Sequence, residues 1–373
     1  MDLPLGTADL YFLGIALCCW LVAAWFYLFR FTAAARNISV NLPAEQLPVS
    51  IIVCAHNEWK NLEQLIPTLL GQDYPHFEVV IVDDGSWDGT ADHVREWSGR
   101  FPQLNLVRLD HEKMRKTGKK LALTLGIKAA RFDHFLLTDA DCMPAGDQWL
   151  KGMAAGFNDG KSLVLGFSPY RKRAGLLNLF IRFETLVTAM QYLAFAVLGK
   201  AYMGVGRNLA YTRKLFFDVK GFASHHHLPA GDDDLFVQEV ATATNTCVVT
   251  QAHTHTFSEP PAGFAAWWKQ KRRHLHIGKH YAAKHRWRLM LLGTVQILFY
   301  LNLFVWPWFT AYFWLPMAAY LLWLLLRIPV LLATALRLRQ QALLWAYPFL
   351  DLLYAVYLLA VGFNAWLAKK TVW

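Results

Sequence analysis

Charged residues and cysteines are scarce in this 373-residue chain. Asp, Glu, Lys and Arg together make up 17% of the residues, while hydrophobic residues make up 55%, which is apolar for a soluble enzyme. The five cysteines form no CxxC pair, so the sequence indicates neither a zinc site nor a disulfide framework. This cysteine usage favours a reducing, cytosolic location for the soluble part of the chain.

Acidic residues are also fewer than basic ones, 27 against 37, which gives a formal net charge of +10. Basic cytosolic loops of a membrane protein account for most of such an excess. Binding of anionic lipid headgroups or of a nucleotide diphosphate fits the same charge. No nucleic-acid-binding motif accompanies it, so we expect no nucleic-acid partner.

The apolar residues are concentrated at the two ends of the chain. Residues 10–31 are long enough to cross a hydrocarbon core of about 30 Å. We expect an uncleaved N-terminal anchor within residues 1–36, because the basic start of a signal peptide is missing. Arg30 and Arg36 then place the following domain in the cytosol. Residues 288–373 contain about three further predicted spans, at 289–308, 310–333 and 343–367.

These spans predict a multi-pass protein of the cytoplasmic (inner) membrane. Arg337 and Arg339 fit a cytosolic loop between the second and third C-terminal spans. With four spans in total, Lys369 and Lys370 fall on the outer side, against the charge rule. The number of spans is therefore uncertain by one.

Two other apolar stretches are typical of interfacial helices. Residues 174–199 are interrupted by Arg182 and Glu184, and residues 261–287 mix Trp and Phe with Lys and Arg. Helices that combine aromatic and basic residues lie in the headgroup plane of a membrane. An ordinary amphipathic core helix fits both patterns equally well.

Residues 45–260 alternate between strand and helix patterns. Strands are predicted at 49–54, 78–84, 104–109 and 134–141, with a helix at 119–130. This alternation predicts an α/β domain with a mostly parallel sheet and right-handed crossovers. Ligands of such sheets bind beyond the carboxyl ends of the strands, which is where the polar clusters of this sequence fall.

Two acidic clusters directly follow predicted strands. Asp83 and Asp84 can hydrogen-bond a base or a ribose. Asp139 and Asp141, two positions apart, suit a Mg²⁺ or Mn²⁺ ion that also holds a diphosphate. Each cluster by itself is equally consistent with a solvated turn.

A third acidic cluster, Asp232–Asp234, and one lysine complete the candidate site. A carboxylate beside other carboxylates can have its pKa raised into the range of a general base. Lys119 is either a residue at a helix start or a cation that neutralises a diphosphate.

Seven segments resemble, in order, the motif series of inverting family-2 glycosyltransferases with the GT-A fold. The resemblance runs from about Val49 to His280. The segments are VSIIVCAHNE, VVIVDDGSWDGT, TGKKLAL, LLTDAD, MGVGRNLAYTRKLF, GDDDLF and QKRRH.

The resemblance implies a role for each matched residue. It implies a nucleotide pocket formed by Ala55, Glu58, Asp83 and Asp84. It implies that Lys119 lies close to the donor, that Asp139 and Asp141 hold the metal and the donor diphosphate, and that Arg207 and Asn208 line the acceptor pocket. It assigns the catalytic base to Asp233, with a register that can slip to Asp232 or Asp234.

The last segment departs from the family pattern at one position. Gln270 and Arg273 match the QxxRW motif of membrane-bound members and imply donor contacts, but His274 replaces the tryptophan that borders the acceptor sugar. This replacement weakens any inference of processive polymerisation.

The expected function is the inverting transfer of a sugar from a UDP- or GDP-linked donor to a membrane lipid at the cytosolic face. The alternative is a processive polysaccharide synthase with the same donor chemistry. A silent membrane scaffold and a nucleotidyltransferase are more distant alternatives, because the acidic motifs are intact and a nucleotidyltransferase needs no membrane helices.

Overall fold

The computed structural model describes residues 6–36, 46–109 and 118–367, and these residues form two compact units. The sheet unit comprises Asn37–Arg173 and Phe195–Pro261. The helical unit comprises Met1–Arg36, Ala174–Ala194 and Ala262–Trp373. The two units are described separately below.

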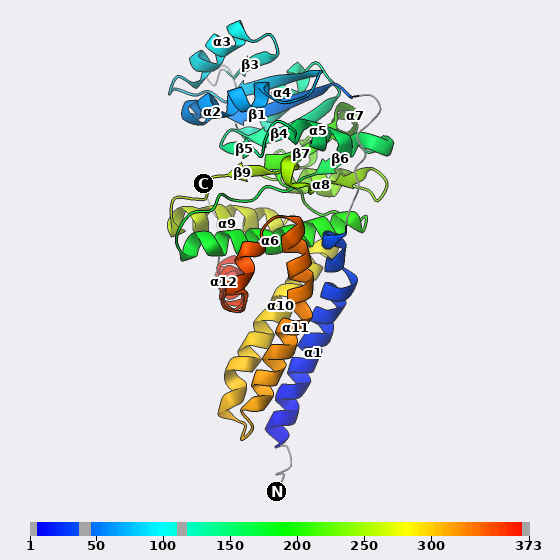
Figure 1. Cartoon of the computed structure of the whole chain (residues 1–373), viewed down its shortest axis with the longest axis vertical. Helices are drawn as coiled ribbons and strands as arrows, with labels where there is room; N and C mark the ends of the chain where they lie inside the picture. Colours follow the sequence, from blue (N-terminus) through cyan, green and yellow to red (C-terminus); the bar gives the residue numbers. More distant parts are fainter. Residues whose placement is uncertain (1–5, 37–45, 110–117, 368–373) are drawn as a thin grey trace. The chain divides into compact units, whose positions relative to one another are not determined.

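A seven-stranded mixed sheet is the centre of the sheet unit (Figure 1). The strand order is β3-β2-β1-β4-β7-β6-β8, and the first four strands in this order are parallel to one another. The strands are β1 (Val49–Ala55), β2 (Phe77–Asp83), β3 (Leu104–Arg108), β4 (His134–Asp139), β6 (Leu163–Leu165), β7 (Leu209–Thr212) and β8 (Thr246–Val248). β5 (Cys142–Pro144) and β9 (Thr256–Ser258) pair separately as an antiparallel ribbon. The predicted mostly parallel GT-A-type sheet is confirmed.

Strand register brings the polar clusters to one edge of the sheet. Ala55 pairs with Asp83 of β2, and Cys54 pairs with Asp139 of β4. The carboxyl ends of three neighbouring strands therefore stop at the same level, as parallel pairing of three strands of similar length requires.

Helices cover both faces of the sheet. One core packs α2 and α5 against alternate residues of β1 and β2, because side chains of a strand point to opposite faces in turn. Gly126 of α4 lies on the other face, where an added Cβ would come within 3 Å of Val82 and Ile52. A glycine is needed there for α4 to approach the strands closely. The helices of this unit are α2 (Trp59–Leu70), α3 (Thr90–Arg100), α4 (Lys119–Ala129), α5 (Trp149–Ala154), α7 (Arg213–Asp218) and α8 (Asp234–Val240).

The helical unit contains three long helices that run side by side, α1, α10 and α11 (Figure 1). Asn302 of α10 donates to the carbonyl of Phe12 in α1, and Trp20 of α1 donates to the carbonyl of Leu322 in α11. The helices of this unit are α1 (Thr7–Phe29), α6 (Leu176–Val197), α9 (Phe264–Gly278), α10 (Ala283–Val305), α11 (Trp314–Arg337) and α12 (Tyr347–Leu367).

Five helices among the described residues are long and apolar enough to cross a membrane. They contain α1, α6, α10, α11 and α12. Four of them fall on the four predicted spans, and the fifth, α6, falls on a stretch predicted to be interfacial. Figure 1 shows α6 and α9 lying across the three long helices, whereas α12 is seen nearly end-on and so crosses them as well.

A buried polar network joins α12 to the three long helices. The Asp351 carboxylate accepts hydrogen bonds from Arg327, Tyr300 and Gln296, and the Arg327 guanidinium also donates to Tyr27. Asp351 is 0% and Arg327 2% exposed. Charges in apolar surroundings need such partners, because an unpaired buried ion is costly.

Candidate functional site

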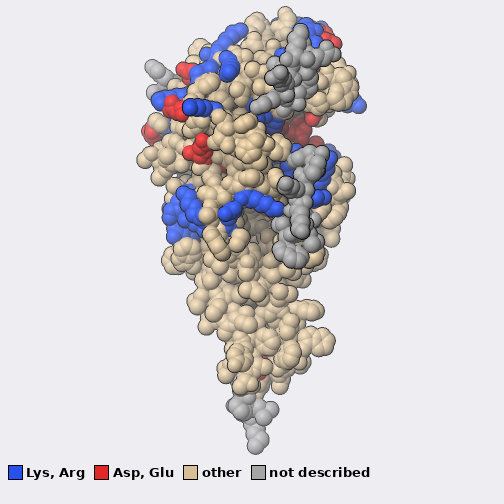
Figure 2. All heavy atoms as spheres, turned by 180° about the vertical axis from the view of Figure 1, so that it is seen from behind, with Lys and Arg blue, Asp and Glu red and all other residues tan. Residues whose placement is uncertain are grey.

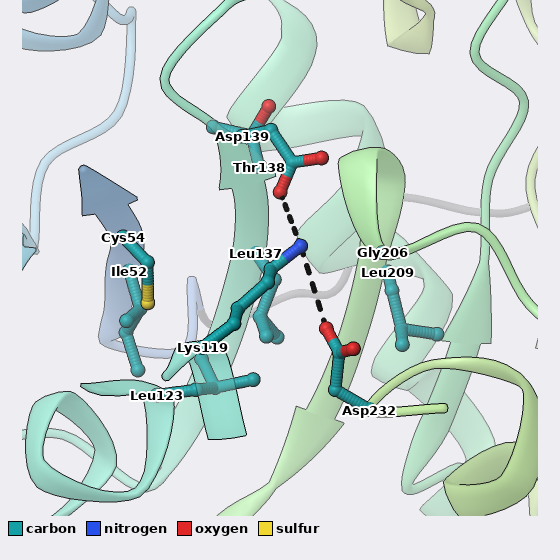
Figure 3. Close-up of a pocket in the computed structure, with 10 residues that line it drawn as sticks. All are labelled: Ile52, Cys54, Lys119, Leu123, Leu137, Thr138, Asp139, Gly206, Leu209 and Asp232. Carbon is teal, nitrogen blue, oxygen red and sulfur yellow. Dashed lines mark hydrogen bonds and ion pairs between the residues drawn. The ribbon is translucent and has the colours of Figure 1, made fainter. Parts of the chain in front are cut away.

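Lys119 lies between two acidic clusters that are far apart in the sequence. Its Nζ is 2.7 Å from Oδ1 of Asp139 and 3.4 Å from Oδ2 of Asp232. Figure 3 shows the lysine side chain pointing from α4 between these two carboxylates. They line a pocket together with Cys54 and Gly206. The fold thus brings together three motifs that the sequence could only place in order.

Neighbouring carboxylates keep the Lys119 ammonium group protonated. Burial alone would lower the pKa of Lys119, but the carboxylates of Asp139 and Asp232 outweigh burial and raise its pKa well above the ordinary value. Lys119 is therefore a fixed cation at the carboxyl end of β4, which suits the binding of a diphosphate.

Asp139, Asp141 and the Cys142 thiol form a group of potential metal ligands. One ligand atom from each residue lies within 4.8 Å of the others. Burial and the charge of Asp139 raise the pKa of Asp141, and a divalent cation would relieve this repulsion. Two carboxylates are a donor set for Mg²⁺ or Mn²⁺. Cys142 is 1% exposed, and its Sγ lies 2.9 Å from Ser258 Oγ.

The contacts of Asp232 and Asp233 differ. Asp232 faces Lys119 in the pocket. Asp233 caps α8: its Oδ1 accepts from the amide of Asp234 at 2.8 Å, and its Oδ2 accepts from the amide of Gly206 at 3.1 Å. Burial and the neighbouring Asp232 raise the pKa of Asp233. The resemblance placed the base at Asp233, whereas these contacts favour Asp232 as the carboxylate that faces the pocket.

The residues of the expected nucleotide pocket lie at the ends of β1 and β2. The backbone of Ala55 accepts from the amide of Asp84 at 2.8 Å, and burial raises the pKa of Glu58. Asp83 is 0% exposed and accepts from the amide of Ser86 through Oδ1. Its Oδ2 has no hydrogen-bond partner among the described residues, although Arg108 Nε lies 3.7 Å away.

Arg207 and Asn208, the expected acceptor residues, have different surroundings. The Arg207 guanidinium stacks 4.7 Å above the ring of Tyr170. Burial opposes the charge of Arg207, but Tyr170 and nearby acids including Asp139 and Asp141 raise its pKa overall. Asn208 is 0% exposed, and it bonds Trp149 and the carbonyls of Phe167 and Thr254. Its side chain holds the fold together and offers no exposed surface to an acceptor.

Gln270, Arg273 and His274 lie on α9 in the helical unit. Lys271, in the same motif, is 8% exposed and forms a buried ion pair with Glu184 of α6. This pair fixes the rotation of α9, and Arg273, two residues after Lys271, must then lie on the opposite side of the helix. Arg273 is exposed in accordance with this rotation, and His274 is exposed as well.

One lysine of the site was missed by the sequence reasoning. Lys120 Nζ donates to the carbonyls of His225 at 2.7 Å and of Leu228 at 3.1 Å. These carbonyls belong to the loop 223–231 that leads to Asp232, which we call the acid loop. The lysine doublet in TGKK was the available signal, but only the long-range contact shows what the second lysine holds.

Comparisons with known proteins agree with this geometry. The family described as "Glycosyl transferase family 2" matches residues 50–219. The chain is 31% identical over 121 residues to glycosyltransferase AglE of Haloferax volcanii, covering 32% of this chain and 38% of AglE. It is 26% identical over 277 residues to the probable glycosyltransferase YdaM of Bacillus subtilis, covering 72% of this chain and 64% of YdaM. The chain therefore spans less than two thirds of either relative.

Similarity to a solved structure extends over nearly the whole chain. The mannosyltransferase PcManGT from Pyrobaculum calidifontis, solved with GDP-Man and Mn²⁺, superposes with a TM-score of 0.60 at 21% identity. The match covers 97% of this chain and 100% of that structure. At this identity the similarity shows a shared fold.

Proposed function

Because the chain belongs to glycosyltransferase family 2 and has the GT-A fold, we propose that it transfers a sugar from a UDP- or GDP-linked donor to a membrane lipid. The observation that carries this proposal is the position of Lys119 between Asp139 and Asp232. This position brings Asp139, of the proposed diphosphate-binding motif, and Asp232, the candidate base, into one pocket. Asp83 Oδ2, which has no hydrogen-bond partner among the described residues, supports the nucleotide part, since a base or ribose donor could bond to it.

The proposed reaction is a single displacement. The acceptor hydroxyl oxygen attacks the anomeric carbon, its proton passes to Asp232, and the bond from the anomeric carbon to the diphosphate oxygen breaks. The electron pair of that bond leaves with the nucleoside diphosphate, so the anomeric configuration is inverted. Lys119 stabilises the charge that develops on the diphosphate. A Mg²⁺ or Mn²⁺ ion held by Asp139 and Asp141 would supply further positive charge there.

The proposal also specifies the acceptor, a membrane lipid. It is supported by the apolar helices, and by α9, which carries exposed Phe264 beside several basic side chains. His274 in place of tryptophan favours the transfer of one or few sugars over a processive synthase. The proposed role of Arg207 is to contact the anionic part of donor or acceptor, and that of Asn208 is structural.

We also propose that the sheet unit lies in the cytosol. Arg30 and Arg36 follow α1, and Arg337 and Arg339 lie at the end of α11, as positively charged cytosolic ends require. If α12 lies in the membrane surface, only α1, α10 and α11 cross the membrane. Lys369 and Lys370 then also lie on the cytosolic side, as the positive-inside rule requires. A fluorescent reporter fused to the C-terminus should then be active in the cytosol.

The deciding experiment uses the purified full-length chain in lipid vesicles. It is incubated with Mn²⁺ or Mg²⁺ and a panel of labelled nucleotide-sugars, and the product is separated by organic extraction and by size. Labelled material of low mass in the organic phase supports the proposal, with an Asp139→Asn variant as the inactive control. Water-soluble polymer of high mass would favour the synthase instead, and an absence of transfer from every donor would contradict both.

A further inference from the structure

The helical unit has almost no acidic residues. Residues 260–350 contain eleven Lys and Arg residues and no Asp or Glu. In the described part of the unit the acids are Asp9, Glu184 and Asp351. Their exposed fractions are 3%, 6% and 0%. The formal charge of this unit is therefore strongly positive.

Each of these three acids is already used inside the unit. Asp9 accepts a hydrogen bond from the indole of Trp306, Glu184 pairs with Lys271, and Asp351 pairs with Arg327. None of the three is left to neutralise a basic residue on the surface. The exposed formal charges in the described part of the helical unit are consequently all positive.

Most of the exposed cations in the described part of the helical unit lie along one stretch, which we call the cationic segment, residues 264–288; Arg36 and Arg339 lie outside it. It comprises α9, the following turn and the first turns of α10. Its exposed cationic side chains are Lys269, Arg272, Arg273, Lys279, Lys284 and Arg286. Phe264 and Trp287 near its two ends are 62% and 68% exposed.

This segment lies toward one end of the three long helices. α10 runs antiparallel to α1, as the contact between Asn302 and Phe12 shows, so the start of α10 lies near the basic end of α1. The connection between α10 and α11, residues 309–313, contains no charged residue. Figure 2 shows no basic side chains over the shafts of α1, α10 and α11 on the face drawn.

We propose that the cationic segment is a docking surface for anionic phospholipid headgroups, which it selects over zwitterionic ones. Exposed aromatic rings beside Lys and Arg place a helix at the boundary of headgroups and acyl chains. Each basic residue near an anionic surface adds attraction that falls off within a Debye length. Because no acid is exposed in the described part of the helical unit, no negative charge of those residues opposes this attraction. The inference does not depend on which sugar or acceptor the enzyme uses.

The test measures lipid selectivity and not catalysis. The purified full-length chain is placed in phosphatidylcholine vesicles that contain trace spin-labelled phosphatidylglycerol or spin-labelled phosphatidylcholine. The fraction of motionally restricted label gives the relative association of each lipid with the protein. We expect a several-fold preference for phosphatidylglycerol that falls toward unity in 1 M salt, where the Debye length is about 3 Å.

Two matched variants locate the effect. Replacing Lys269, Arg272, Lys279 and Lys284 by Gln should abolish most of the preference, and it leaves Arg273 in place. Replacing four exposed lysines of the sheet unit, Lys60, Lys128, Lys214 and Lys220, by Gln removes the same charge and should leave the preference intact. Equal association of both lipids with the wild type, or a preference that salt does not reduce, would overturn the proposal. So would equal losses in the two variants, and the salt series on the wild type decides even where a variant fails to fold.

Discussion

Lys119 donates a hydrogen bond from Nζ to Oδ1 of Asp139 at 2.7 Å. In the proposed mechanism, the lysine neutralises a carboxylate that would otherwise repel the donor diphosphate, and its ammonium group attracts that diphosphate. We expect Lys119→Met to lower kcat/KM by about 10²–10³-fold, the range for removing one electrostatic donor. Lys119→Arg, which keeps the charge, should be less impaired. Equal rates for wild type and Lys119→Met in a steady-state assay would contradict this role.

We predict that sugar transfer depends on a divalent metal ion bound by Asp139 and Asp141. Asp139→Asn and Asp141→Asn each remove a hard anionic ligand, so we expect weaker Mn²⁺ binding as well as loss of transfer. Mn²⁺ binding is measured by electron paramagnetic resonance of the free ion, which needs no donor. Full transfer in the presence of a chelator would exclude the metal from the mechanism.

The neighbouring acids Asp232 and Asp233 should behave differently. Asp232→Asn should lower kcat by about 10²–10⁴-fold while nucleotide binding persists, as expected for loss of a general base. Asp233→Asn keeps an N-cap residue, so we expect a smaller loss of rate with a lower thermal midpoint. If Asp233→Asn costs more in kcat than Asp232→Asn, the family register that assigns the base to Asp233 is correct and our reading of the contacts is not.

Lys120 should act by holding the acid loop. Its ammonium group satisfies two loop carbonyls, so Lys120→Met should increase amide exchange in residues 223–231 and reduce kcat, with little change in donor KM. Lys120→Arg can donate to both carbonyls and should restore protection and rate. Unchanged amide exchange of residues 223–231 in Lys120→Met would show that the acid loop is stable without the Lys120 hydrogen bonds.

The acid loop should also loosen as the pH falls. Burial and the charge of Lys120 lower the pKa of His225 to about 4, below the ordinary value of about 6.5. Between these values the opened loop binds a proton that the closed loop does not, so acidification favours opening. We expect amide exchange of residues 223–231, corrected for intrinsic rates, to rise from pH 7 to pH 5. His225→Gln should remove this dependence, and its persistence would point to another group.

The positions of four strands along the chain, and the polar residues at their ends, followed from local patterns. Strands 49–54 and 134–141 were predicted because short apolar runs ended in polar residues, and β1 and β4 occupy these positions with Cys54 beside Asp139. Family resemblance added the likeness to GT-A enzymes, which the comparisons confirm. These features depend on residues close together in the chain, so sequence alone could predict them.

Contacts between residues far apart in the chain could not be predicted from the sequence. The partner of Lys120 lies 105 residues away, and nothing in the lysine doublet indicates it. Asn208 was predicted to touch the acceptor because it stands in a matching motif, but only the packing shows that Trp149 and two carbonyls use its amide. The choice between Asp232 and Asp233 likewise depends on which of the two carboxylates caps the N-terminus of α8.

The ion pair between Arg327 and Asp351 has a consequence for how the chain is made. Asp351 lies near the start of α12, so until α12 is synthesised Arg327 stands among apolar helices without its counterion. A chain interrupted before residue 351 would carry an uncompensated charge there, which costs about 3–5 kcal/mol in a buried site. We therefore expect that replacing Arg327 or Asp351 alone by an apolar residue destabilises the helical unit more than replacing both together.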